Sequence, residues 1–188
     1  MIEAGWHQWL GTFTGVALLA VAALPVAALA VCALAARRTG TGTAPAWAWR
    51  RSLAEVGIVY GTVPWVWMTM LPGSRAGEVP GRVSLVPLLD LPTRSTDQVV
   101  GNLLVFAALG LFAPVRFAAL ASPPRILVLA ASCSAVVETA QYVLQLDRVS
   151  SVDDVLLNTA GAGLAALASR RWWRQPEPSA GSGYLVIS

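Results

Sequence analysis

The residues best suited to chemistry are polar side chains inside long apolar runs. Glu138 and Gln141 are three residues apart, which places both on one face of a helix. Asn102 and Asn158 each interrupt another apolar run. A charged side chain near the bilayer centre costs about 2.5–3.5 kcal/mol on insertion scales, so such groups normally face a bundle interior or a wet cavity. We therefore interpret these four residues as parts of one polar pocket.

Further charged residues stand directly before and within the start of the apolar run that contains Asn158. Asp154 lies four residues before Asn158 and shares its helix face, whereas Asp153 points elsewhere and is expected to cap the helix start. Arginine can bind a carboxylate or a phosphate at two points. The cations available for this task are Arg82, Arg94 and Arg148. The predicted ligand-binding set is Arg82, Asn102, Glu138, Gln141, Arg148, Asp153, Asp154 and Asn158.

A structural role is an open alternative for each of these residues. Glu138 either holds helices together as a protonated or paired carboxyl, or acts on a substrate, proton or ion. The two asparagines are equally suited to hydrogen bonding between helices. Asp154 is also a possible ion-pair partner of Arg148.

Cofactor chemistry finds little support in the sequence. His7 is the only histidine, so a usual zinc site and a Ser-His-Asp triad are excluded, and we predict no metal site and no cofactor. There is no Walker loop or dinucleotide fingerprint. Cys32 and Cys133 fall inside apolar runs and are interpreted as small buried hydrophobes.

The composition shows what kind of element must position these residues. Charged residues make up 12% of the 188, about half the share usual in globular domains, and 56% are hydrophobic. So few charges cannot cover the surface of a soluble protein, and disordered chains are poor in apolar residues. The 13 basic side chains are all arginine, which is expected of loops on the cytoplasmic side and needs no nucleic-acid partner. The chain is predicted to be an integral membrane protein.

Its fold is predicted to be all-α, a polytopic transmembrane helix bundle of about five spans. A span needs about 20 mainly apolar residues. The first run has no arginine before it and two after it, so an uncleaved span is favoured over a signal peptide. The predicted spans are 13–36, 53–71, 99–120, 126–146 and 152–169.

Arginine placement predicts the orientation. Arginines are most frequent in segment 37–52, around connection 121–125 and in the tail from residue 170, so the positive-inside rule puts the N-terminus outside and the C-terminus in the cytoplasm. At 1.5 Å per residue, Glu138 then lies roughly 12 Å, Asn158 about 9 Å and Asn102 about 5 Å below the outer helix ends. Three helices therefore place polar groups at overlapping depths.

The predicted organisation has five parts, of which the third and fourth overlap. Residues 83–89 are apolar but too short to cross, so they lie at the interface or re-enter the membrane. Gly161, Ala162 and Ala165 share a face with Asn158 and should let a neighbouring helix approach closely. The parts are an external N-terminal segment (1–12), two spans joined by an Arg-rich cytoplasmic loop (13–71), an external or interfacial loop (72–98), a core with three spans (82–169) and a flexible cytoplasmic tail (170–188).

Several motifs follow one another in a fixed order: residues 82–87, residues 102–106 with Gly110, residues 134–141, Arg148 and residues 152–162. Together they resemble the signature of the VanZ-like family, over roughly 82–168. The chain departs from that pattern at four positions, including Ser151, where the family usually has an acidic residue. The other three are Ser84, Leu88 and Leu109. The resemblance implies a small multispanning protein of the bacterial plasma membrane, in a family associated with teicoplanin resistance.

Three functions follow as hypotheses. The first is a non-enzymatic envelope protein whose outer-leaflet pocket binds a lipid-linked precursor or a glycopeptide-like ligand. The second is a membrane-embedded enzyme or transporter for polyprenyl or phospholipid substrates, in which carboxylates and arginines hold a divalent cation against a phosphate. No nucleophile–base pair supports catalysis. The third is a scaffold for a partner protein.

Overall fold

The computed structural model describes residues 11–88 and 91–173, and the chain in this part is all-α apart from two very short strands. Expectations for residues 1–10 and 174–188, including His7 and most of the tail, concern residues outside those described. The elements are α2 (Phe13–Gly40), α3 (Pro45–Thr69), β1 (Arg82–Ser84), α4 (Thr96–Val105), α5 (Ala107–Arg116), α6 (Pro123–Val143), β2 (Val149–Ser151) and α7 (Val152–Ser169), with 3-10 turns at Leu91–Thr93, Ala118–Leu120 and Arg170–Trp172.

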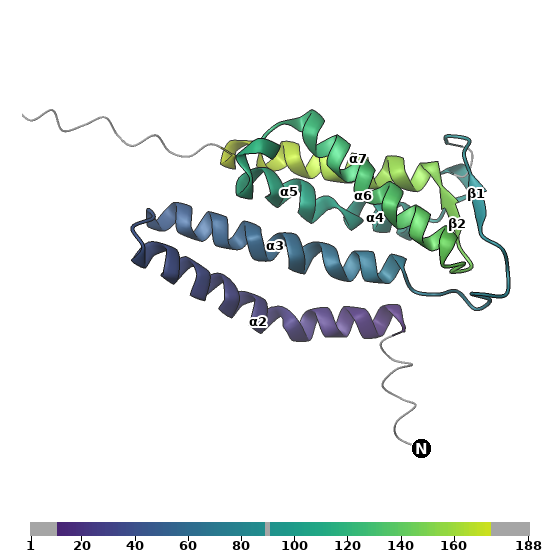
Figure 1. Ribbon diagram of the computed structural model, residues 1–188, viewed down its shortest axis with the longest axis horizontal. Coiled ribbons are helices and arrows are strands. Elements are labelled where there is room, and N and C mark those ends of the chain that lie inside the picture. Colours follow the sequence, from purple (N-terminus) through teal and green to yellow (C-terminus); the bar gives the residue numbers. More distant parts are fainter. Residues whose placement is uncertain (1–10, 89–90, 174–188) are drawn as a thin grey trace, which may run out of the picture.

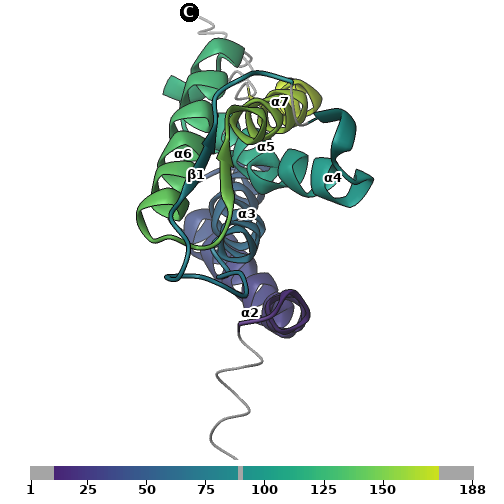
Figure 2. The ribbon, with the colours of Figure 1, turned by 90° about the vertical axis from the view of Figure 1, so that its right-hand side faces the viewer.

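The helices lie roughly along one axis, with α2 and α3 as an antiparallel pair and α3 packed against α5 (Figure 1). Seen along that axis, α5 and α7 lie beside each other beyond α3, with α6 on one flank and α4 on the other (Figure 2). The buried core lies between α4, α5, α6 and α7. It consists of Val105, Phe106, Ala113, Ile126, Ala130, Ala162 and Ala166.

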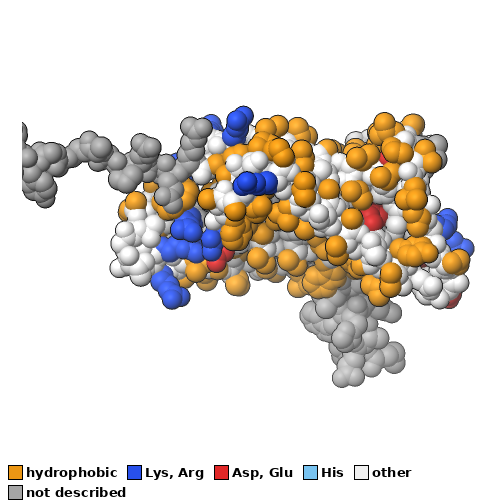
Figure 3. Space-filling model, turned by 45° about the horizontal axis from the view of Figure 1, so that its top comes forward, with side chains coloured by type: hydrophobic (Ala, Val, Ile, Leu, Met, Phe, Trp, Pro, Cys, Tyr) orange, Lys and Arg blue, Asp and Glu red, His pale blue; other side chains and the backbone are white. Residues whose placement is uncertain are grey.

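Three helical segments in the described part of the chain are long and apolar enough to cross a membrane: Phe13–Gly40, Thr96–Arg116 and Pro123–Val143. Their outer faces carry exposed side chains such as Leu24, Val26 and Leu29. Figure 3 shows apolar side chains over most of one face, with arginines gathered toward the end of the bundle where α2 ends and α3 begins. This surface is that of a membrane protein.

Several predicted helix boundaries are confirmed and others are wrong. The last helix, α7, has the predicted bounds. By contrast, α3 begins at Pro45 rather than residue 53, so Arg50 and Arg51 are helical and the connection after α2 is short. Proline suits the first helical position because its missing N–H would be unpaired there anyway. Hydropathy misses this extension because it detects apolar length and not helix length.

The predicted span 99–120 is not one straight helix. It is divided at Phe106 into α4 and α5, and the second of these ends at Arg116. Phe106 has φ −114° and ψ 13°, outside the helical region, and its side chain is buried. The residues on both sides are apolar, so nothing in the hydropathy pattern indicates the break. In the end-on view α4 projects sideways from the bundle (Figure 2).

Two glycines allow the closest helix approaches, and they confirm the predicted role of the small residues in α7. A Cβ added to Gly161 would overlap the backbone carbonyl of Leu103 in α4. A Cβ added to Gly110 in α5 would overlap the carbonyl of Ala162. Backbone can meet backbone here because neither glycine carries a side chain.

The strands β1 and β2 pair in parallel, with Arg82 opposite Val149 and Ser84 opposite Ser151. The pair ties the segment after α3 to the start of α7, at the end of the bundle where α3 and α6 finish (Figure 1). The segment 83–89 therefore begins as a strand, which its short apolar run does not reveal. Val83, Leu85 and Val86 are exposed.

Candidate functional site

A cavity of about 660 Å³ lies at the end of the bundle where α3 and α6 finish and α4 and α7 begin. Six residues of the predicted set line it: Asn102, Glu138, Gln141, Arg148, Asp154 and Asn158. The other charged residues of its lining are Arg94 and Asp97. The tertiary structure thus brings together side chains from α4, α6, α7 and the segment between β1 and α4.

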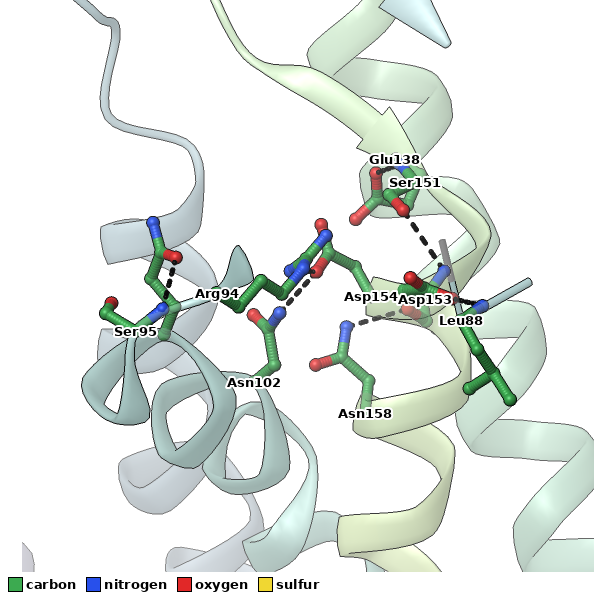
Figure 4. A network of polar contacts seen from close by, with 11 residues as sticks. Leu88, Arg94, Ser95, Asn102, Glu138, Ser151, Asp153, Asp154 and Asn158 are labelled. Carbon is green, nitrogen blue, oxygen red and sulfur yellow. Dashed lines mark hydrogen bonds and ion pairs between the residues drawn. The ribbon is translucent and has the colours of Figure 1, made fainter. Parts of the chain in front are cut away.

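Asp154, in the first turn of α7, joins two of these elements. One of its carboxylate oxygens, Oδ1, accepts hydrogen bonds from both the guanidinium of Arg94 and the side-chain amide of Asn102 (Figure 4). The Arg94 and Asp154 side chains are 15% and 17% exposed, so the ion pair is largely withdrawn from solvent. The alternative in which Arg148 pairs with Asp154 is therefore wrong. Arg94 occupies that place because it directly precedes α4, which packs on α7.

Glu138 is held by the backbone at the start of α7. Its carboxylate oxygen Oε2 accepts a hydrogen bond of 2.9 Å from the Ser151 backbone N–H, and its backbone carbonyl accepts one of 2.8 Å from the Ser150 hydroxyl. No arginine of the described chain lies within ion-pair distance of it. Glu138 is 9% exposed, so it is a nearly buried carboxylate that only neutral donors contact.

Asn158 lies one helical turn beyond Asp154 and is 3% exposed. Its amide nitrogen donates to the hydroxyl of Ser134 in α6 at 2.8 Å. Its amide oxygen is buried and has no hydrogen-bond partner among the described residues. Figure 4 shows the side chain turned from α7 toward the side where Asn102 lies.

Gln141 and Arg148 both bind the end of α3. Gln141 donates to the carbonyl of Thr69 at 2.8 Å, and Arg148 donates through Nε to the carbonyl of Leu71 at 3.2 Å. The Thr69 carbonyl is one of those that a helix end leaves unpaired, and Leu71 lies two residues beyond the end of α3. The rest of the Arg148 guanidinium stays available at the cavity wall.

The two remaining members of the predicted set are not on the cavity wall. Arg82 lies in β1 and is exposed. Asp153 is 1% exposed and accepts a 2.5 Å hydrogen bond from the backbone N–H of Leu88, a residue with φ +63°. The prediction that Asp153 caps α7 is wrong, because Ser151 is the N-cap and its hydroxyl accepts from the Asp153 N–H at 3.2 Å. Serine is among the preferred N-cap residues.

The lining of the cavity is also partly apolar, and the sequence does not single out these residues. It contains Phe13 at the start of α2, Trp65 and Met68 near the end of α3, and Val105 and Val137. Apolar residues in a membrane helix give no signal of which ones face a cavity. Arg94 is absent from the predicted ligand-binding set. The sequence does point to it, as one of the three cations available on the outer side.

The site can donate and accept hydrogen bonds beside an apolar surface. Two buried polar atoms of its lining have no hydrogen-bond partner among the described residues, the Arg94 Nε and the Asn158 oxygen, and Arg148 donates there only through Nε. In the described chain no three His, Cys, Asp or Glu side chains are grouped closely enough to hold a metal ion. Such a site is suited to binding an amphiphile.

Comparison with known proteins agrees with the resemblance in the sequence. The family described as VanZ/LLP1 matches residues 58–173, more than half of the chain. The match extends beyond the residues that carry the signature and includes the second half of α3, with its apolar residues of the cavity lining. No curated protein and no solved structure matches the chain. The chain belongs to the VanZ/LLP1 family.

Proposed function

We propose that this protein is a multispanning protein of the bacterial plasma membrane that binds a lipid-linked envelope ligand in the cavity. The single observation that carries the proposal is the composition of the cavity lining, which combines charged and amide side chains with apolar ones. An amphiphile with a polar headgroup and a hydrocarbon chain matches both kinds of side chain at once.

The position of the cavity supports this kind of ligand. It lies at the end of the bundle opposite Arg37 and Arg38, which finish α2. By the positive-inside rule that arginine-rich end is cytoplasmic, so the cavity faces the outer leaflet. A lipid entering from the outer leaflet would reach the polar side chains of the lining with its headgroup.

Arg148 is the group best placed to receive an anionic part of the ligand. Arg94 is already neutralised by Asp154. Arg148 makes one bond through Nε to a neutral carbonyl, and it forms no ion pair in the described chain. A guanidinium with free N–H groups binds a phosphate with geometric specificity.

Binding such a ligand would alter how a glycopeptide or a lipid-linked precursor meets the cell surface. The resemblance to a family associated with teicoplanin resistance gives the phenotype to measure. The minimal inhibitory concentration of teicoplanin should rise in a sensitive bacterium that expresses the protein. Arg148→Ala should lower it to the level of cells without the protein, because the only unpaired cation on the described cavity wall is lost.

Glu138→Gln should have the same effect, because it removes the carboxylate charge and keeps the side-chain length. Thr139→Val is the matched control, since Thr139 is the next residue in α6, is exposed, and bonds only within its helix. Membrane-fraction immunoblots must show equal amounts of each variant. Full resistance with both cavity variants at equal expression would contradict the proposal.

A further inference from the structure

We propose that the headgroup bound in this cavity is zwitterionic and carries a primary ammonium group together with a phosphate. This inference rests on the proposed function and names the ligand class of the same site. In the described chain the cavity contains one carboxylate and one guanidinium that form no ion pair, and a buried acceptor without a donor. A headgroup with one charge of each sign satisfies all three.

The buried acceptor is the side-chain oxygen of Asn158. A buried amide oxygen without a hydrogen bond is costly, and buried polar atoms in folded proteins are nearly always paired. Asn158 is 3% exposed, and its nitrogen is already used by Ser134. No described residue donates a hydrogen bond to this oxygen, and a donor on a ligand would complete it.

The carboxylate without an ion pair is Glu138. Its Oε2 accepts from the Ser151 backbone N–H, the Ser150 hydroxyl donates to its backbone carbonyl, and neither donor is charged. Placing a carboxylate in a membrane helix costs free energy unless an opposite charge pairs with it. A ligand ammonium between Glu138 and the Asn158 oxygen would supply the missing charge to the first and a hydrogen bond to the second.

Arginine donors form the other half of the binding site. The Nε of Arg94 is buried without a partner, and the terminal nitrogens of Arg148 have none among the described residues. A phosphate ester oxygen fits such donors. The remaining charged residue of the lining, Asp97, is exposed in the first turn of α4.

The charge balance separates this ligand from a purely anionic lipid. The Arg94–Asp154 pair is neutral, so a bare anion would compensate Arg148 and bring a second negative charge close to Glu138. Like charges at short range in a medium of low dielectric repel strongly. A zwitterion avoids this repulsion.

Phosphatidylethanolamine and phosphatidylcholine are the matched probes, because they share the phosphate and net charge and differ in whether the nitrogen carries hydrogen-bond donors. The full chain is purified in detergent, and each lipid is titrated while thermal unfolding is followed, since a ligand of the folded state raises the melting temperature. We expect the apparent Kd for phosphatidylethanolamine to be about tenfold lower or more, the ratio expected for hydrogen bonds of a charged donor.

Variants then assign the preference to the cavity. Asn158→Leu and Glu138→Gln should bring the ratio of the two Kd values close to one. Ser134→Ala is the control for Asn158, because it removes the bond to the amide nitrogen and leaves the oxygen in place. This variant should keep the preference, which rules out a general effect of loosening the contact between α6 and α7.

The outcomes distinguish this inference from the proposed function. Equal affinity for the two lipids in the unaltered protein would overturn the inference, as would equally tight binding of phosphatidylglycerol, which has hydroxyl donors but no ammonium. If Arg148→Ala still weakens binding in that case, the cavity is a lipid site and the proposed function stands. If no cavity variant changes the affinity for any lipid, both are wrong.

Discussion

At the scale of single residues, Asp154 is the group on which the site depends. One carboxylate oxygen engages both Arg94 and Asn102, and so it links α7 to α4 and to the segment before it. Ion pairs that are largely buried contribute little net stability when intact. Removing one partner, however, leaves the other charge buried and unpaired. Asp154 thus positions α4 beside the cavity rather than simply adding a negative charge to its wall.

Asp154→Ala should therefore lower the free energy of unfolding by about 3–5 kcal/mol, because Arg94 is left as an unpaired and largely buried cation. The double substitution Asp154→Ala with Arg94→Met should lower the free energy of unfolding by clearly less than the sum of the two single effects. The measurement is a double-mutant cycle from reversible unfolding in detergent. Additive effects would mean that the pair does not form.

At the scale of elements, the backbone contacts of α7 decide where the polar residues meet. Gly161 lets α7 approach the backbone of α4, and that approach brings Asp154 and Asn102 within hydrogen-bond distance. Phe106 divides α4 from α5, so the part of the chain that carries Asn102 follows its own direction. In a straight helix through this region, the direction of the turn that carries Asn102 would be fixed by the rest of the helix.

Gly161→Ala should destabilise the protein by about 1–3 kcal/mol, since the new methyl group overlaps the Leu103 carbonyl and the backbone has to move. Gly101→Ala in α4 is the control. Nothing lies within 4 Å of its added Cβ. That substitution should stabilise by about 0.5–1 kcal/mol through helix propensity. Thermal unfolding compares the two, and a similar effect of both would refute the close approach.

At the scale of the whole molecule, the two ends of the bundle differ in chemistry. The end opposite the cavity has its own ion-pair cluster, in which Glu55 of α3 accepts from Arg38 at 2.5 Å and from Arg116 at 2.9 Å. These contacts connect α2, α3 and α5. The Glu55 side chain is 41% exposed, so the cluster is screened by solvent and contributes modestly to stability. The cluster matters for the orientation of the protein, because it holds Arg38 and Arg116 at the end of the bundle opposite the cavity.

This asymmetry predicts the orientation in the membrane. With Cys32 and Cys133 replaced by alanine, Ser74→Cys near the cavity end should react with a membrane-impermeant maleimide in intact cells. Thr41→Cys, in the turn between α2 and α3, should react only after the membrane is opened. Positive-inside placement of the arginines is the reason. The reverse labelling pattern would place the cavity on the cytoplasmic side and remove the basis for an outer-leaflet ligand.

Sequence alone determined the class of the protein and most of the polar residues at its site. Scarcity of charge excluded a soluble fold, and polar side chains in apolar runs stood out because lipid tolerates them poorly. Helix periodicity also placed Asp154 with Asn158, and Glu138 with Gln141, on shared faces. Such inferences succeed because they depend on local composition and on the fixed geometry of a helix.

Only the tertiary structure decided which partner each polar group takes. Arg94 rather than Arg148 pairs with Asp154, Asp153 binds the backbone at Leu88, and Arg82 lies away from the cavity. The apolar part of the lining is likewise a product of packing, because Phe13 and Trp65 look like any other lipid-facing side chain in the sequence. Pairings between distant segments depend on how closely helices approach and where they bend, and neither glycine contacts nor the break at Phe106 can be derived from hydropathy.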